Sequence, residues 1–157
     1  DRFSKIGSIP ELKKHNVVKE TKDAFTYFES RSSKQVIFKF ESQKATLHSE
    51  INLQLYGWVI ENLVKNAIDA MKGKGEISIS IIETMKNIDV LVSDTGKGIP
   101  KNLRKQIFSP GFTTKKRGWG LGLSLSKRII EDYHKGKIFV KKSELDKGTT
   151  FCVSLRK

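Results

Sequence analysis

The sequence is poor in cysteine and contains no long hydrophobic run. Cys152 is the single cysteine among 157 residues, which excludes an internal disulfide and favours a reducing compartment. No stretch of about 18 apolar residues is available to cross a membrane as a helix, and the opening DRFSKIGSIP lacks the basic-then-apolar layout of a signal peptide. We therefore expect a soluble, cytoplasmic segment, and a membrane anchor elsewhere in a longer parent chain stays open.

Acidic residues are scarce relative to basic ones. The chain has 17 Asp and Glu against 30 Lys and Arg, a formal net charge of +13. Such an excess is typical of proteins that bind nucleic acid or an acidic membrane surface. The lysines are dispersed and form no long basic block, so an ordinary soluble basic surface accounts for the charge equally well. Charge alone leaves both interpretations open.

The length and the hydrophobic content of 37% fit one compact domain with a core. Hydrophobic periodicity predicts helices at residues 17–30, 49–71 and 121–133. Alternating segments predict strands at residues 36–40, 76–82, 88–94, 137–142 and 150–155. The second and third strands are expected to pair as an antiparallel hairpin. This order predicts an α+β fold, a two-layer sandwich of a mixed five-stranded sheet with about three helices on one face.

A connection of about 25 residues, rich in glycine and lysine, runs from residue 95 to residue 119. Ordinary connections have roughly 4–6 residues, and loops as long as this one inside a compact domain are usually functional or disordered. The loop is therefore a candidate functional segment.

The longest predicted helix carries a polar stripe. Asn62, Asn66 and Asp69 are spaced four and three residues apart, so their side chains lie on one edge of the helix. A solvated helix edge would explain the stripe. However, asparagine is a poor helix former, so two asparagines in the middle of one helix favour a functional role. Their amide oxygens are suitable ligands for a hard cation such as Mg²⁺.

Asp94 ends a predicted strand and is followed by the glycine-containing segment TGKG. Glycines there let a flat ring approach the backbone closely, while the carboxylate accepts a hydrogen bond from an exocyclic amine. An ordinary turn, in which the Asp94 side chain bonds its own backbone, is the alternative.

The segment GWGLGLS leads directly into the third predicted helix. Its glycines, Gly118, Gly120 and Gly122, leave the N–H groups of the first helical turn accessible, which is favourable for a phosphate. Lys115, Lys116 and Arg117 would supply compensating charge for a triphosphate.

Five segments together carry a family resemblance: ENLVKNAIDA (61–70), DTGKGIP (94–100), IFSPGFTTK (107–115), GWGLGLSLSKRII (118–130) and KGTTF (147–151). They resemble the N, G1, F and G2 boxes and the closing strand of the ATP-binding domain of bacterial sensor histidine kinases, within the GHKL superfamily. The resemblance implies a Bergerat fold, with residues 17–157 as the catalytic domain and an ATP lid at about residues 100–120. Residues 1–16 resemble the end of a dimerisation helix and a linker.

The resemblance also implies roles for individual residues. Asn66 would coordinate Mg²⁺ with Asn62 assisting, and Asp94 would bind the adenine amine. Thr149 would contribute through a water, with Gly96 and Gly98 giving the ring room. Further nucleotide contacts or lid anchors are implied at Lys65, Asp69, Ile99, Phe108, Phe112, Thr114, Lys115, Gly118, Gly120, Leu121, Gly122 and Leu123.

The subgroup depends on Asn62. Gyrase, mismatch-repair and heat-shock ATPases and serine-directed kinases of the superfamily usually carry a glutamate at this position, where it can act as general base. An amide accepts no proton at neutral pH, which fits phosphoryl transfer to histidine, a nucleophile already unprotonated on one nitrogen. Glu61 resembles the acidic residue of many histidine kinases and is a possible polarising group.

The phosphoacceptor histidine is not expected in this sequence. None of His15, His48 and His134 lies in an acceptor-type helical setting, so we predict structural or surface roles for all three. The resemblance implies an upstream dimerisation domain, a response regulator downstream and a homodimeric parent, with the present chain a monomer. A GHKL-type conformational ATPase and a basic nucleic-acid-binding module remain alternatives, although we expect no nucleic acid as partner. Lys135 stands where the family often has glycine.

Overall fold

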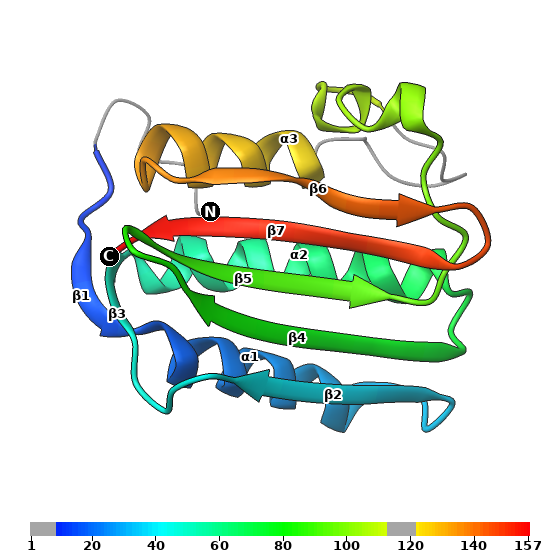
Figure 1. Cartoon of the computed structure of the whole chain (residues 1–157), viewed down its shortest axis with the longest axis horizontal. Helices are drawn as coiled ribbons and strands as arrows, with labels where there is room; N and C mark the ends of the chain where they lie inside the picture. Colours follow the sequence, from blue (N-terminus) through cyan, green and yellow to red (C-terminus); the bar gives the residue numbers. More distant parts are fainter. Residues whose placement is uncertain (1–8, 113–121) are drawn as a thin grey trace.

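The computed structural model describes residues 9–112 and 122–157. A five-stranded mixed sheet forms one layer (Figure 1), in the order β2-β4-β5-β7-β6. Its strands are β2 (Val36–Ser42), β4 (Gly75–Glu83), β5 (Asn87–Asp94), β6 (Lys137–Glu144) and β7 (Gly148–Arg156). β2 and β4 run parallel, and the other neighbours are antiparallel, including the predicted β4–β5 hairpin.

Helices form the second layer, on one face of the sheet (Figure 1). They are α1 (Val17–Arg31), α2 (Leu53–Ala70) and α3 (Gly122–Lys127), which continues as the π-helical turn η3 (Arg128–Tyr133). Two short 3₁₀ turns, η1 (Lys101–Leu103) and η2 (Gln106–Phe108), follow β5. The α+β sandwich predicted from the order of elements is confirmed.

The core lies between the layers because each element offers one apolar face. Alternate residues of a strand point to the same side, and those of β4 and β5 that face the helices are fully or almost fully buried: Ile77, Ile79, Ile81, Ile88, Val90 and Val92. α2 contributes Val59, Ile60, Leu63 and Val64. Full burial of such a side chain stabilises the fold by roughly 1.5–3 kcal/mol.

Asparagine caps fix where the two longer helices begin. The Asn16 side chain accepts a hydrogen bond from Val18 N at 3.1 Å, and that of Asn52 accepts one from Leu55 N at 3.0 Å. A side-chain oxygen at this position satisfies an N–H group that the helix itself leaves unpaired. The cap at Asn52 sets the start of α2.

The predicted start of the long helix at residue 49 is therefore wrong. Residues 49–51 belong to β3 (His48–Ile51), which pairs antiparallel with β1 (Lys13–Asn16) as a separate two-stranded sheet. Ser49 and Ile51 are buried while His48 and Glu50 are exposed, a period of two that a helix cannot provide. The end of the expected linker is likewise a strand of the domain.

The C-terminal ends of the predicted helices agree with the structure to within one residue. α2 stops where Lys72 and Gly73 take φ of 55° and 77°, a left-handed conformation that a helix cannot continue. The third helix ends at Tyr133 as expected, but its last residues form the π-helical turn η3. Within the described residues, no helix combines the length and apolar character needed to span a bilayer.

Candidate functional site

Asp94 lies at the C-terminal end of β5 and is 9% exposed. Its Oδ1 accepts a hydrogen bond from Gly96 N at 2.8 Å, so the turn considered as an alternative does form. Burial raises the pKa of the Asp94 carboxyl above its usual value, and the backbone N–H groups of Gly96 and Thr149 oppose that rise. A buried carboxylate with few donors is a strong acceptor for a ligand's N–H.

The loop after Asp94 is held between the end of α2 and the β6–β7 turn. Lys97 N donates to Ala70 O at 3.1 Å, and Asp146 N donates to Lys97 O at 2.8 Å. Two backbone segments therefore fix the middle of this loop, which makes it a rigid edge beside Asp94.

Both glycines of this loop are needed for close packing. A Cβ at Gly96 would lie 2.6 Å from the backbone of Ala70, and one at Gly98, whose φ is 77°, would lie 2.3 Å from Glu144 O. Only glycine fits such approaches. Their role in giving an aromatic ring room stays a prediction.

Thr149 lies beside Asp94 in β7 and is buried. Its Oγ1 is 2.8 Å from the Ser143 Oγ, which in turn accepts a hydrogen bond from Ile99 N at 2.7 Å. Ser143 therefore joins β6, β7 and the loop around one hydroxyl pair. The sequence analysis missed Ser143, since only the pairing of β6 with β7 brings it opposite Thr149.

Asn62, the first residue of the polar stripe of α2, faces the start of α3. The Asn62 Nδ2 donates to Ser126 Oγ at 3.2 Å, and a Cβ at Gly122 would lie 2.3 Å from Asn62 Oδ1. Asn62 and Asn66 are partly buried, while Asp69 is exposed. A solvated edge therefore does not describe Asn62, which is packed between two helices.

Glu61 and Lys65 pair with each other, at 3.1 Å between Lys65 Nζ and Glu61 Oε1. Lys65 is exposed, and exposed pairs of this kind contribute at most about 1 kcal/mol. The pair can therefore open at little cost, and the separate roles expected for the two residues stay predictions.

Phe108 is buried rather than open to a ligand. Its ring packs edge-on against Phe151 at a centroid distance of 6.2 Å, and Phe112 is partly buried against the same core. Both side chains therefore hold residues 108–112 against the core, and their role as anchors of a lid stays a prediction. Ile99 and Leu123 are also partly buried against the core. Several predicted contacts lie outside the described residues: Thr114, Lys115, Lys116, Arg117, Gly118, Gly120 and Leu121.

His134 is a structural residue, as predicted. It is buried, its Nδ1 lies 2.9 Å from Ile129 O, and its Nε2 accepts a hydrogen bond from Asn52 N at 3.1 Å. These partners require the neutral ring with its proton on Nδ1. Burial lowers the pKa of His134 accordingly. His48 is exposed and His15 partly buried.

Cys152 is unreactive by position. It is 1% exposed, and burial, together with nearby Asp89, raises the pKa of its thiol to about 12. The thiolate is the nucleophilic form of cysteine, so nucleophilic chemistry at Cys152 is excluded.

Comparison with known proteins agrees with this geometry. Residues 53–157 match the family described as histidine kinase-, DNA gyrase B-, and HSP90-like ATPase. Sporulation kinase A of Bacillus subtilis (strain 168) is 42% identical over 99 residues, which cover 63% of this chain and 16% of that kinase. The chain thus spans a small part of this relative's length.

Solved structures extend the likeness over nearly the whole chain. The catalytic domain of histidine kinase ThkA, in a nucleotide-free form, has a TM-score of 0.85 and 36% identity, covering 94% of this chain and 96% of that one. ThkA in complex with response regulator protein TrrA gives a TM-score of 0.81 at 33% identity, over 93% of this chain and 42% of that one. This chain therefore belongs to the histidine kinase-, DNA gyrase B- and HSP90-like ATPases, as an ATP-binding domain of the histidine kinase type.

Proposed function

We propose that this domain is the catalytic part of a two-component sensor histidine kinase, which transfers the γ-phosphoryl group of Mg²⁺-ATP to a histidine of a dimerisation domain. The observation that supports this proposal is the presence of an amide side chain, and not a carboxylate, at position 62. An amide, held by Ser126, stands on the polar edge of α2, at the position where the hydrolytic relatives carry a basic carboxylate. Asn62 cannot deprotonate water, whereas a neutral imidazole needs no base.

Adenine recognition is assigned to Asp94. One oxygen of its buried carboxylate accepts a hydrogen bond from Gly96 N. We expect the carboxylate also to accept a hydrogen bond from the exocyclic amine of the base. The rigid loop held by Ala70 and Asp146 keeps that carboxylate in place before the nucleotide arrives. Thr149, next to Asp94, supports the same contact through a water.

Mg²⁺ is assigned to the amide oxygen of Asn66. Asn66 is partly buried, one helical turn after Asn62 on the same edge of α2, and a neutral oxygen ligand suits a cation that takes most of its ligands from phosphates and water. When bound, Mg²⁺ neutralises charge on the β- and γ-phosphates. Asn62 assists by orienting the same group, and its bond to Ser126 links that orientation to α3.

Phosphate binding is assigned to the segment between Phe112 and α3, together with Lys65. From the family resemblance we expect Lys115 and the backbone of Gly118, Gly120 and Gly122, the last at the start of α3, to contact the phosphates. Phe108 and Phe112 anchor the N-terminal side of this lid by packing into the core. Asp69, Ile99 and Leu123 complete the walls of the site.

Partners follow from the same assignment. Residues 1–16 are the end of a dimerisation helix and a linker, with β1 already packed on the catalytic domain, and residues 17–157 form that domain. The complex of ThkA with a response regulator supports a response regulator as partner of the parent protein. We expect the domain to lie in the cytoplasm and the parent protein to be a homodimer.

The function is tested by supplying the missing acceptor. The chain is mixed with a separately produced dimerisation domain carrying an acceptor histidine, with Mg²⁺ and γ-labelled ATP. Label should appear on the dimerisation domain as acid-labile, alkali-stable phosphate, and Asp94→Ala and Asn66→Ala should abolish it. Release of inorganic phosphate without any labelled histidine would instead identify a conformational ATPase.

A further inference from the structure

A cavity of about 520 Å³ opens at the end of the sheet opposite Asp94. β7 starts at Gly148, whose Cα lies against the Asp94 backbone, and ends at Arg156, which lines the cavity. At about 3.3 Å per residue the two ends are about 26 Å apart. In Figure 1 this is the end where β1, β3 and the C-terminus lie together. The cavity is thus separate from the nucleotide site.

Basic side chains from three separate parts of the chain line this cavity. They are Lys14 in β1, Lys135 after η3, and Arg156 and Lys157 at the end of β7, against one acidic residue, Glu50. A volume of this size is in the range of small-molecule sites, about 300–1,000 Å³. Its walls therefore favour a small molecule with negative charge.

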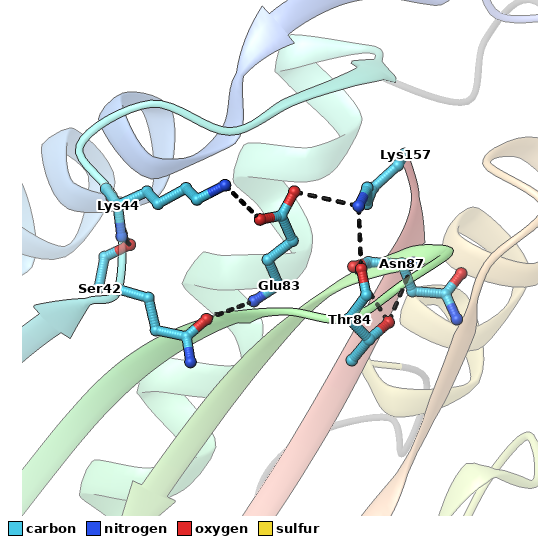
Figure 2. Close-up of polar contacts among 7 residues, drawn as sticks. Ser42, Lys44, Glu83, Thr84, Asn87 and Lys157 are labelled. Carbon is cyan, nitrogen blue, oxygen red and sulfur yellow. Dashed lines mark hydrogen bonds and ion pairs between the residues drawn. The ribbon is translucent and has the colours of Figure 1, made fainter.

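Three of these cations form no ion pair in the described part of the chain, although Glu50 lies opposite Lys14 in the β1–β3 pair. The ammonium of Lys157 is engaged elsewhere (Figure 2), at 3.1 Å from Glu83 Oε2 and 3.0 Å from Thr84 O. Across residues 9–112 and 122–157, no carboxylate lies within ion-pairing distance of Lys14, Lys135 or Arg156. Like charges around one cavity repel each other, and an anion between them would relieve that repulsion.

The backbone of Lys135 adds a second, independent observation. Its φ is 57°, in the left-handed region that disfavours a residue with a Cβ and that glycine adopts freely. Lys72 and Asp146 share this conformation, but of the three only Lys135 lines the cavity. Strained residues of this kind gather at ligand sites.

We propose that this cavity binds a small anion carrying more than one phosphate group, held by Lys14, Lys135 and Arg156. Arg156 offers the planar fork that engages two phosphate oxygens, and the lysines act as point charges. Cations on three segments match an anion with several charged groups better than a single phosphate ion. The His134 ring in the wall is engaged by Asn52 N and Ile129 O and so contributes shape.

Inorganic pyrophosphate is the probe, titrated at constant ionic strength while backbone amide shifts are followed by NMR. Saturable shifts are expected at Gly136 and Arg156, and they should persist in Asp94→Ala, which separates this site from the nucleotide site. Lys14→Ala and Arg156→Ala should each weaken binding about fivefold or more. Citrate at equal charge serves as the carboxylate counterpart and should bind more weakly.

Lys72 provides a matched control, because its φ of 55° is close to the 57° of Lys135 while it lies outside the cavity. Lys135→Gly and Lys72→Gly should both keep or raise the melting temperature, since glycine adopts this φ without strain. Only Lys135→Gly should weaken pyrophosphate binding. Shifts that do not saturate, equal binding by Lys135→Gly and wild type, or equal weakening by both variants would each overturn the proposal.

Discussion

The side-chain amide of Asn62 donates a hydrogen bond to the hydroxyl of Ser126, at 3.2 Å between Nδ2 and Oγ. Ser126 is fully buried and itself donates to Gly122 O at 2.9 Å. Because Gly122 begins α3, the middle of α2 is tied to the first turn of the helix that follows the expected lid. The orientation of Asn62 therefore depends on where α3 starts.

Ser126→Ala should weaken nucleotide binding through this connection. The substitution removes the hydroxyl that fixes the Asn62 amide, and loss of a buried hydrogen bond costs about 1 kcal/mol of stability. We expect a lower affinity for AMP-PNP with Mg²⁺, measured by calorimetry, together with a lower free energy of unfolding in urea.

Ser154→Ala is the control for that experiment. Ser154 Oγ in β7 donates to Asp89 Oδ1 in β5 at 2.7 Å. This hydrogen bond does not involve α2, so losing it should lower stability without changing nucleotide affinity. Wild-type nucleotide affinity in Ser126→Ala would show that Asn62 does not depend on Ser126.

Asp94→Asn should lose nucleotide binding without losing stability at neutral pH. Burial raises the pKa of Asp94 above its ordinary value of 3.8, so the stability that this group contributes is present below pH 3.8 and is lost as pH rises through the folded-state pKa. Asparagine does not ionise, so the variant does not lose stability as pH rises, and its side-chain oxygen can still accept a hydrogen bond from Gly96 N. Its amide N–H, however, opposes the amine of adenine.

Urea unfolding across the acid range checks the sign for Asp94. The stability of Asp94→Asn relative to wild type should increase as pH rises above about 4. A variant that becomes less stable than wild type on raising the pH would contradict the burial argument.

Gly98→Ala should lower the free energy of unfolding of the domain far more than Gly111→Ala does. Both glycines have positive φ, 77° and 84°, but the new Cβ lies 2.3 Å from Glu144 O at Gly98 and has nothing within 4 Å at Gly111. The conformation alone costs about 1–2 kcal/mol, and the clash adds roughly 1–3 kcal/mol. Equal losses in unfolding free energy would mean that the loop can shift away from β6.

His134 should make the domain less stable in mild acid. Burial lowers the pKa of His134 from its ordinary 6.5, so its contribution is complete above pH 6.5 and is lost as pH falls towards the folded-state pKa. Melting temperatures between about pH 8 and pH 5 should fall more steeply for wild type than for His134→Gln. The exposed His48 provides His48→Gln as a control; a wild-type slope in His134→Gln would contradict this role.

The sheet, its helical layer and the position of Asp94 could be predicted because each depends on a local period. The start of α2 could not, since the four residues of β3 are too few for their alternation to compete with the helical pattern that follows. β1 was missed for the same reason. In both cases pairing between distant segments decides the structure.

Candidate site residues follow the same division. Asn62 and Asn66 stand out because asparagine is a poor helix former in mid-helix, and Asp94 because it ends a strand directly before a glycine-containing segment. Ser126 and Ser143 do not stand out, because serine is common in helices and strands. The role of Ser126 depends on Asn62, 64 residues away in the sequence. The role of Ser143 depends on the β6–β7 pairing, which brings it opposite Thr149.

The central claim is that Asp94 and the polar edge of α2 form one nucleotide site, and its most direct test is an NMR titration with AMP-PNP and Mg²⁺. Amide shifts should gather in residues 62–70, 94–99 and 148–150, with Asp94→Ala abolishing them all and Asn66→Ala removing their dependence on Mg²⁺. Undiminished binding in both variants, or shifts confined to other parts of the domain, would contradict the account.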